Sequence, residues 1–173
     1  MKDRDEMSNS RKAAVVEGKF TSSQVARAVG VDSRRLEGWM ERDILRPKGE
    51  SKQGVPMEYS FGDAMVAAVL AELQRLLGSD FRPGRVASLV EEALDPRSLN
   101  LLGLLAAPAG SRARPEGGRV FTAHLVIRNV HGEPEAEILY HLDVSQMPSA
   151  ILVDLGRLGT DLLKCLEAEM ARA

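Results

Sequence analysis

The stretch "FTSSQVARAVGVDSRRLEGWMERDILRP", residues 20–47, carries two short helical patterns on either side of one glycine. Thr21 or Ser22 is suited to cap the first helix, whose apolar residues recur three and four positions apart. Gly30 tolerates the left-handed conformation that commonly follows the end of a helix. So short a pair of helices buries little surface by itself, and we therefore expect it to present one helix to a partner.

The second helix of the pair is predicted over residues 33–42, with Asp32 or Ser33 as its cap. Leu36, Trp39 and Met40 lie three and four positions apart and mark its apolar face.

The composition is typical of a soluble globular protein. The chain has 173 residues, of which 44% are hydrophobic and 28% charged, and this balance argues against wholesale disorder. No apolar run approaches the ~20 residues that a membrane span requires, and the N-terminus lacks the apolar segment of a signal peptide. We therefore expect a cytoplasmic protein of bacterial type without a membrane partner. The single cysteine, Cys165, allows no internal disulfide and is expected to be a small buried hydrophobe.

The charge is distributed unevenly along the chain. Residues 1–60 hold 12 basic and 10 acidic side chains, whereas residues 61–173 hold 11 and 15. Affinity for phosphates depends largely on Lys and Arg. The sign of the asymmetry permits nucleic-acid binding at the N-terminal end but does not establish it.

The pattern along the chain predicts an α+β protein in four segments. These are a mobile charged arm at 1–17, a mainly helical domain at 18–95, a short apolar helix with a Pro/Gly-rich linker at 96–118, and a hairpin-helix module at 119–173.

Within the helical domain, residues 48–58 contain two glycines and a proline and indicate a small hairpin or wing. A longer helix is predicted to begin at Phe61 and to stop at Gly78. Another is expected to open at Pro83.

Beyond residue 118 the pattern changes from helical to alternating. The segments "FTAHLVIRNV" and "EAEILYHLDV" flank a loop at 131–134 and are predicted to form an antiparallel hairpin. A slip of one residue would send the apolar side chains to the wrong face, so the alternation favours one register. In that register Leu125 faces Tyr140, Ile127 faces Ile138, and Arg128 faces Glu137.

An amphipathic helix is predicted from about residue 149 to residue 171, where it supplies a cover for the hairpin. A module of one hairpin and one helix buries little apolar surface and is marginal as a monomer. We therefore expect a homodimer through residues 119–173, or association with another regulatory protein. The residues predicted to make this contact are Leu125, Ile127, Ile138, Tyr140, Ile151, Leu155, Leu158, Leu162 and Leu166.

The two N-terminal helices fit a helix-turn-helix mechanism. In such a pair the first helix braces the second, which lies in the DNA major groove with its N-terminal residues at the base edges. Arg34 and Arg35 occupy that first turn, where an arginine can donate two hydrogen bonds to a guanine. Ser33 is expected to bind a phosphate, and Trp39 to pack under the helix or against the DNA backbone.

Together with "GVPMEYSFGDAMVAAVLAELQRLLG", the opening stretch resembles the winged-helix DNA-binding domain of MerR-type transcriptional regulators. The resemblance covers roughly residues 20–94. It implies a sequence-specific regulator that binds double-stranded DNA and reads the major groove with the helix at 33–42. The residues in register with the family pattern are Gly30, Val31, Arg34, Leu36, Trp39, Ile44, Leu45, Arg46, Pro47, Tyr59 and Asp63.

Three residues depart from the family pattern. Glu37 and Gly38 stand where the recognition helix usually has Arg and Tyr, and Met57 stands where the wing commonly has an arginine. The loss of these phosphate contacts would either weaken the affinity for DNA or move the contacts to Lys48, Lys52 and the N-terminal arm. The full set of expected DNA-binding residues is Ser22, Ser33, Arg34, Arg35, Trp39, Arg42, Lys48, Lys52 and Tyr59.

The sequence holds no phosphate-binding loop, nucleophile elbow or metalloprotease helix, and we expect neither an enzyme nor a cofactor. In the expected register His124 and His141 lie opposite each other, but a closed zinc site needs four ligands, so we expect no metal. Two alternatives to a regulator remain open. One is a protein-interaction adaptor with a degenerate winged helix, and the other is a phage-type accessory DNA-binding protein, such as an excisionase or packaging subunit.

Overall fold

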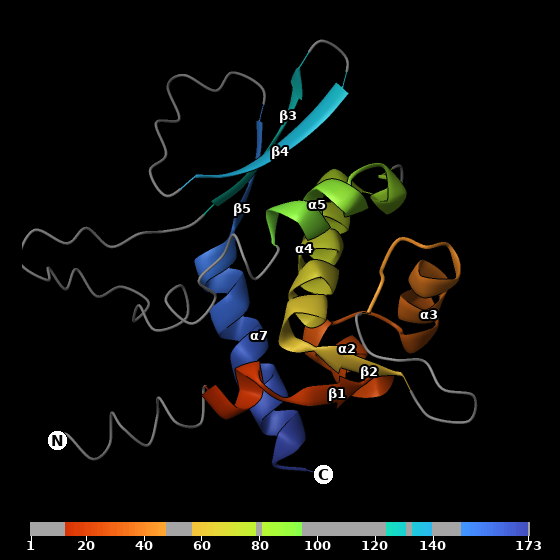
Figure 1. The fold of residues 1–173 in the computed structure, drawn as a ribbon, viewed down its shortest axis with the longest axis vertical. Helices are drawn as coiled ribbons and strands as arrows, with labels where there is room; N and C mark the ends of the chain where they lie inside the picture. The colour runs from red at the N-terminus through yellow and green to blue at the C-terminus, as the bar shows by residue number, and fades with distance from the viewer. Residues whose placement is uncertain are drawn as a thin grey trace, which may run out of the picture.

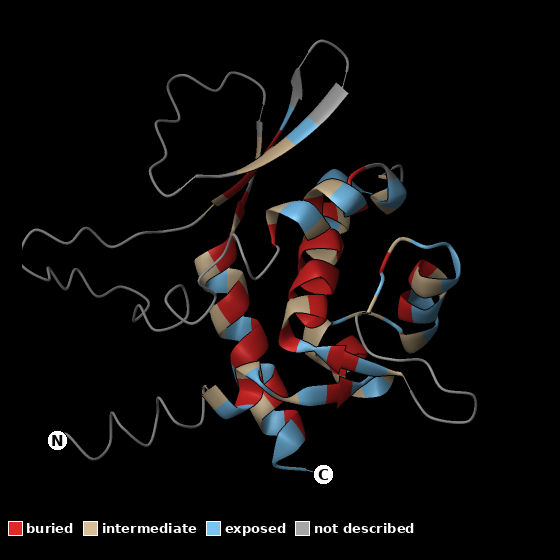
Figure 2. Ribbon diagram, viewed as in Figure 1, coloured by how far each residue is buried: buried red, intermediate tan, exposed pale blue. Residues whose placement is uncertain are grey.

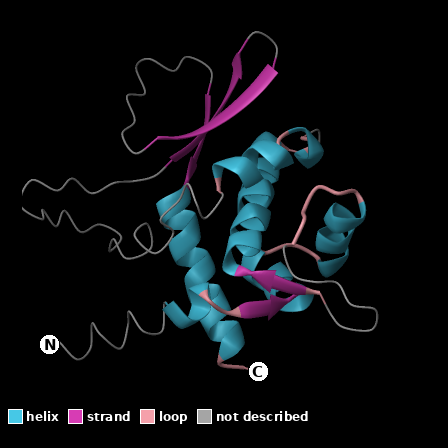
Figure 3. Ribbon diagram, in the orientation of Figure 1, coloured by secondary structure: helices cyan, strands magenta, loops and turns pink. Residues whose placement is uncertain are grey.

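The computed structural model describes residues 13–47, 57–78, 81–94, 124–130, 133–139 and 150–172. They form a mixed α+β structure with two small antiparallel sheets, as the sequence predicts. The two sheets lie at opposite ends of a central pair of helices, α4 (Phe61–Leu77) and α7 (Leu155–Met170), which run side by side in opposite directions (Figures 1 and 3).

The first sheet joins the beginning of the helical domain to its middle. β1 (Lys19–Thr21) pairs antiparallel with β2 (Glu58–Ser60), so that Phe20 lies opposite Tyr59. Both aromatic side chains are buried. The sequence pattern did not indicate β1, because a three-residue strand is too short for an alternation to be recognised.

The segment before β1 is partly ordered into the core. Residues 13–16 are helical, and Val15 is buried at 2% exposure. Residues 13–16 of the predicted arm at 1–17 thus form a helical turn with Val15 in the core, and residues 1–12 lie outside the described ranges.

The two short helices form as predicted. α2 (Ser22–Val29) begins with a capping box in which Thr21 and Gln24 satisfy each other's backbone N–H groups. Gly30 follows with a φ of 76°, the left-handed conformation that glycine adopts without strain. α3 (Ser33–Glu41) is capped by Asp32, whose Oδ1 accepts a hydrogen bond from the backbone N–H of Arg34 at 2.8 Å.

The next helices are also confirmed. α4 starts with a second capping box, between Ser60 and Asp63, and ends at Gly78. Pro83 opens a 3-10 turn, η1 (Pro83–Arg85), and α5 (Ala87–Ala93) continues from it. Proline suits such a start because its missing N–H would have no partner there.

The second sheet has three strands, where the sequence predicted two. β3 (His124–Val130) lies between β4 (Glu133–Leu139) and β5 (Ala150–Asp154), and both neighbours pair with it antiparallel.

The predicted hairpin register is wrong by two residues. β3 and β4 pair Leu125 with Ile138 and Ile127 with Ala136, and only two residues separate Val130 from Glu133. Short connections of this length are the commonest in hairpins. A shift of two keeps every side chain on its predicted face, so the apolar pattern could not distinguish the two registers.

The same shift changes the cross-strand partners. Arg128 lies opposite Glu135, and its guanidinium reaches diagonally to Glu137 at 2.7 Å. His124 lies opposite Leu139, so the expected pairing of His124 with His141 is also wrong.

The C-terminal helix begins six residues later than predicted. Residues 150–154 form β5, with Ile151 opposite Ile127 on β3, and Asp154 caps α7 by accepting from the N–H of Arg157. Ile151 therefore belongs to a strand and not to the helix. The β-branched Ile151 and Val153 favour an extended backbone, which explains the difference.

The described residues share one hydrophobic core that spans both predicted domains. α7 packs mainly against α2 and α4, and only its beginning contacts the sheet (Figure 2). The helix α7, which was expected to cover the hairpin, therefore packs chiefly against the N-terminal helices α2 and α4. The core residues from the C-terminal part are Leu125, Ile127, Val153, Leu155, Leu162, Leu163 and Leu166.

This packing corrects the predicted oligomerisation surface. Leu125, Leu155 and Leu166 are fully buried within the chain, Leu162 and Ile127 nearly so, and they are not free to contact a second copy. Ile151 and Leu158 are half-buried. Tyr140 and the side chain of Ile138 lie outside the described residues, as do the linker at 96–118 and the wing residues 48–56.

Cys165 is exposed, contrary to expectation. No helix in the described ranges has the length and apolar character needed to cross a bilayer.

Candidate nucleic-acid interface

Only one face of α3 packs against the hydrophobic core. Leu36 is fully buried and Trp39 is 2% exposed, and both belong to the core. Because successive residues turn by about 100° around a helix, the face opposite these two side chains is centred on the row that holds Arg34 and Glu41. In Figure 1, α3 lies on the outside of the molecule, away from the central helices.

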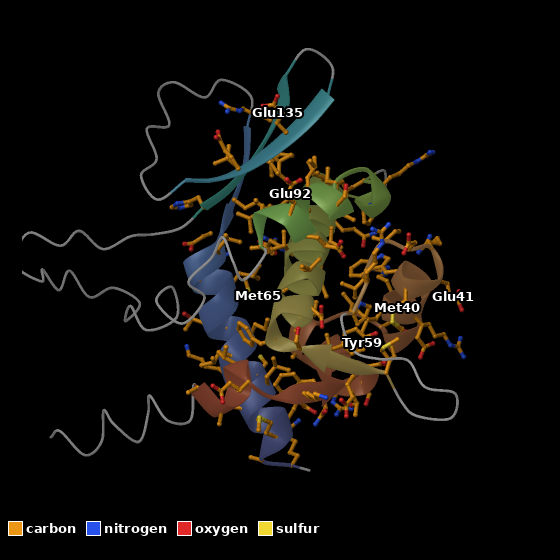
Figure 4. All side chains as sticks on the ribbon, in the orientation of Figure 1. Met40, Glu41, Tyr59, Met65, Glu92 and Glu135 are labelled. Atoms are coloured by element: carbon orange, nitrogen blue, oxygen red, sulfur yellow. The ribbon has the colours of Figure 1, made fainter. Side chains whose placement is uncertain are left out.

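The outward face of α3 has two flanks of opposite charge. Arg35 and Arg42 lie to one side of Arg34 and Glu37 lies to the other, while Glu41, two turns further along, lies almost in line with Arg34; all of them are exposed. In Figure 4, Glu41 stands at the outer edge of the molecule. The separation follows from the helical period and gives the face a basic side.

Within the described ranges, the two arginines of the first turn have no partner. The side chains of Arg34 and Arg35 make no hydrogen bond or ion pair with any residue that the structure describes. Arg42 differs, because its Nε donates to the carbonyl oxygen of Gly38 at 2.7 Å and the side chain folds back on its own helix.

The turn after α3 is braced by an ion pair. Asp43 has a φ of 58° and holds the guanidinium of Arg46 at 2.6 and 2.7 Å. This pairing lowers the pKa of the Asp43 carboxyl, mainly through the hydrogen bond from Arg46. Arg46 therefore pairs with Asp43 within the turn that follows α3.

Two aromatic residues of the expected DNA-binding set are buried. Tyr59 is fully buried and donates its phenol proton to Met40 Sδ at 2.8 Å, and Figure 4 shows these two side chains beside each other. Burial raises the pKa of the Tyr59 phenol. Since Trp39 is buried as well, neither aromatic ring is available to DNA. Both rings belong to the core that packs against the inner face of α3.

The remaining expected residues are placed as follows. Ser22 and Ser33 are half-buried, and Ser22 lies close enough to hydrogen-bond the phenol of Tyr59. Lys48 and Lys52 lie outside the described residues. The structure therefore brings Arg34, Arg35 and Arg42 together on one helix, with Ser33 at its start.

No metal site is formed by the residues that the structure describes. A cavity of about 500 Å³ near the exit of α3 is lined by Asp63, Glu91 and Glu92, among others. Asp63 is engaged by Ser60, and no group of three or more His, Cys, Asp or Glu among the described residues is arranged to hold an ion.

A larger cavity, of about 510 Å³, lies between the α2–α3 turn, α4 and α7 and includes Arg35 in its wall. Sequence reasoning missed it, because its lining residues come from parts of the chain more than a hundred positions apart. No local pattern could have indicated it.

Neither a scan against protein-family models nor a search of curated proteins finds a match to this chain.

Proposed function

We propose that this protein is a sequence-specific double-stranded DNA-binding transcriptional regulator whose residues 18–95 act as a winged helix-turn-helix domain. In this proposal α3 enters the major groove and Arg34 contacts base edges, with Arg35 and Arg42 beside it on the basic flank. The segment between α3 and β2 would act as the wing.

The observation that carries the proposal is a pair of exposed arginines, without partners in the part of the chain that the structure describes, in the first turn of an outward-facing helix. A cation at a helix N-terminus is unfavourable, because the helix dipole is positive there. The stability of α3 therefore gives no reason for two arginines at this place. Binding of an external anion would explain the two arginines, and a DNA backbone or a guanine edge supplies the matching hydrogen-bond acceptors.

A second candidate, a protein-interaction adaptor, is favoured by the exposed carboxylates of Glu37 and Glu41 on the same outward face as Arg34. Two carboxylates beside the groove would repel phosphates. The two candidates differ in their dependence on salt, since only the DNA-binding protein releases counterions when it binds a duplex.

The test is a fluorescence-anisotropy titration with labelled duplexes that tile the protein's own promoter, repeated over a series of salt concentrations. A regulator gives one preferred fragment and an affinity that falls as salt rises. No duplex binding at low salt would reject the regulator and leave the adaptor.

The arginines are tested by Arg34→Ala/Arg35→Ala, which should lower the affinity for the preferred duplex at least about tenfold. The matched control is Arg82→Ala/Arg157→Ala, which removes the same charge from exposed positions outside α3. Equal losses in the two double variants would mean that net charge, and not α3, determines binding.

Association of two copies is a further part of the proposal. A homodimer would protect two half-sites about one helical turn apart, which footprinting detects. The surface involved must differ from the buried leucines of the C-terminal part.

A further inference from the structure

The 510 Å³ cavity exists because α7 packs across the N-terminal helices. Its walls include Val29 and Val31 from the α2–α3 turn, Ala71 from α4, and Leu158 and Leu162 from α7. The volume lies within the range of about 300–1,000 Å³ that small-molecule sites occupy. An apolar wall with a few polar groups is also what such sites share.

One of the charged residues that line the cavity has no partner in the described part of the chain. Glu72 accepts two hydrogen bonds from Arg75, at 2.7 and 2.8 Å, and lies 3.8 Å from Arg157. Asp161 is 4.0 Å from Lys164. Arg35 is thus the charged lining residue whose side chain has no partner in the described part of the chain, and the unsatisfied charge of the cavity is positive.

One further lining residue has an unsatisfied polar atom. Oε1 of Gln74 is buried and accepts no hydrogen bond from the described residues. A buried acceptor without a donor is unfavourable, so a bound molecule that brings an N–H or O–H group to Gln74 gains from it.

We propose that this cavity binds a small organic anion that carries an apolar body and a hydroxyl or N–H group, with Arg35 as its anchor. The anionic group, a carboxylate or a phosphate ester, receives two parallel hydrogen bonds from the guanidinium. The apolar body lies against Ala71, Leu158 and Leu162, and the hydroxyl or N–H group donates to Gln74.

This site makes Arg35 a residue shared between ligand and DNA. An anion held in the cavity takes the guanidinium away from the basic flank of α3, so occupancy weakens DNA binding. Thermodynamic linkage requires that DNA weakens ligand binding by the same factor. The regulatory effect rests on the proposed function, whereas the ligand site does not.

The ligand site is tested without DNA through Cys165, which lines the cavity, is exposed and is the single cysteine of the chain. The measurement is the rate of Cys165 alkylation by N-ethylmaleimide, an uncharged reagent that does not compete for Arg35. The probes are mandelate and phenyl phosphate, with neutral mandelamide and equal ionic strengths of chloride as controls.

The expected result is a saturable slowing of alkylation by mandelate or by phenyl phosphate, and none by mandelamide or chloride. Whichever anion protects identifies the anionic group. Absence of saturable protection by both anions up to millimolar concentrations, or equal slowing by chloride, overturns the proposal.

Three variants identify the anchor. Arg35→Gln should weaken the protecting anion about tenfold, whereas Arg34→Gln, one position along the same helix and outside the cavity, should leave protection unchanged. Ala71→Leu fills the cavity and should abolish protection. Full protection in Arg35→Gln would overturn the role of Arg35.

The regulatory effect is tested by adding the protecting anion to the anisotropy titration. Saturating anion should weaken duplex binding by the wild type at least about fivefold and leave the Ala71→Leu variant unaffected. If Cys165 is protected but no duplex binds, the proposed function fails and the ligand site stands. If a duplex binds with unchanged affinity, the coupling is overturned and the proposed function stands.

Discussion

Gly38 gives the outward face of α3 its shape. It lies beside Arg34 on that face, and its carbonyl oxygen accepts the hydrogen bond from Arg42. A Cβ at this position would meet only the Arg42 guanidinium, at 3.4 Å. The glycine therefore leaves this part of the outward face without a side chain. It also makes α3 less stable than an alanine at the same position would.

We expect Gly38→Ala to raise the free energy of unfolding by about 0.5–1 kcal/mol, because the helical backbone accepts a Cβ and the flexible Arg42 tip can move aside. Urea denaturation followed by Trp39 fluorescence measures it. Gly30→Ala is the contrasting variant, since its φ of 76° makes any side chain strained. A loss of stability in Gly38→Ala would mean that the space above Gly38 is not available.

Tyr59 supports α3 from inside, so its hydroxyl should matter for stability and not for DNA. We expect Tyr59→Phe to lower the free energy of unfolding by about 1 kcal/mol through loss of a buried hydrogen bond. Affinity for the preferred duplex should not change. A drop in affinity at unchanged stability would restore Tyr59 as a DNA contact.

The contact between α2 and α7 includes a buried carboxylate. Glu169, whose side chain is 6% exposed, accepts hydrogen bonds from Arg27 on α2 and from Arg172 just after α7. The hydrogen bond from Arg27 is the main reason why the pKa of Glu169 lies below its usual value. This ion pair ties the first helix of the domain to the last helix of the chain.

The lowered pKa has a defined consequence for stability against pH. The folded state binds the proton of Glu169 less readily than the unfolded state, so the contribution is complete above the unfolded pKa near 4.5 and is lost as the pH falls through the folded value. Glu169→Gln should therefore destabilise the protein at pH 7, and the difference from wild type should shrink on acidification.

Urea denaturation at a series of pH values measures this effect. Asp161→Asn is the matched control, because it removes a carboxylate from an exposed position of the same helix. A constant difference between Glu169→Gln and wild type at every pH would contradict the assignment.

The common core makes the folding of α3 depend on α7. Trp39 and Leu166 belong to one cluster of buried residues, although they come from opposite ends of the chain. Two independent domains would unfold separately, whereas a shared core of this size is expected to unfold in one cooperative step.

We expect Leu166→Ala to lower the free energy of unfolding by about 2–5 kcal/mol, the cost of a cavity at a fully buried leucine. The loss should be equal when unfolding is followed by Trp39 fluorescence and by far-ultraviolet circular dichroism. Trp39 is the single tryptophan and reports on α3 alone. A Trp39 transition that stays at its wild-type position would show that the N-terminal domain folds by itself.

Local signals allowed the helices and their caps to be predicted. Capping residues such as Thr21 and Asp32 act within a few positions, and Gly30 and Gly78 end helices through their own backbone freedom. The outward position of Arg34 and Arg35 follows from the same short-range periodicity. These properties depend on neighbours in the sequence, so the sequence was enough to infer them.

The tertiary structure decided which apolar faces meet. An amphipathic helix specifies that Leu162 and Leu166 are buried, but not what covers them, and α7 could satisfy its apolar face on the hairpin or on α2 and α4 equally well. The hairpin register had the same ambiguity, because a shift of two residues leaves both faces unchanged. The burial of Tyr59, the Arg27–Glu169 ion pair and the cavity at Arg35 all follow from that choice of partner. Contacts between distant residues arise from the packing of whole elements, and no short pattern carries them.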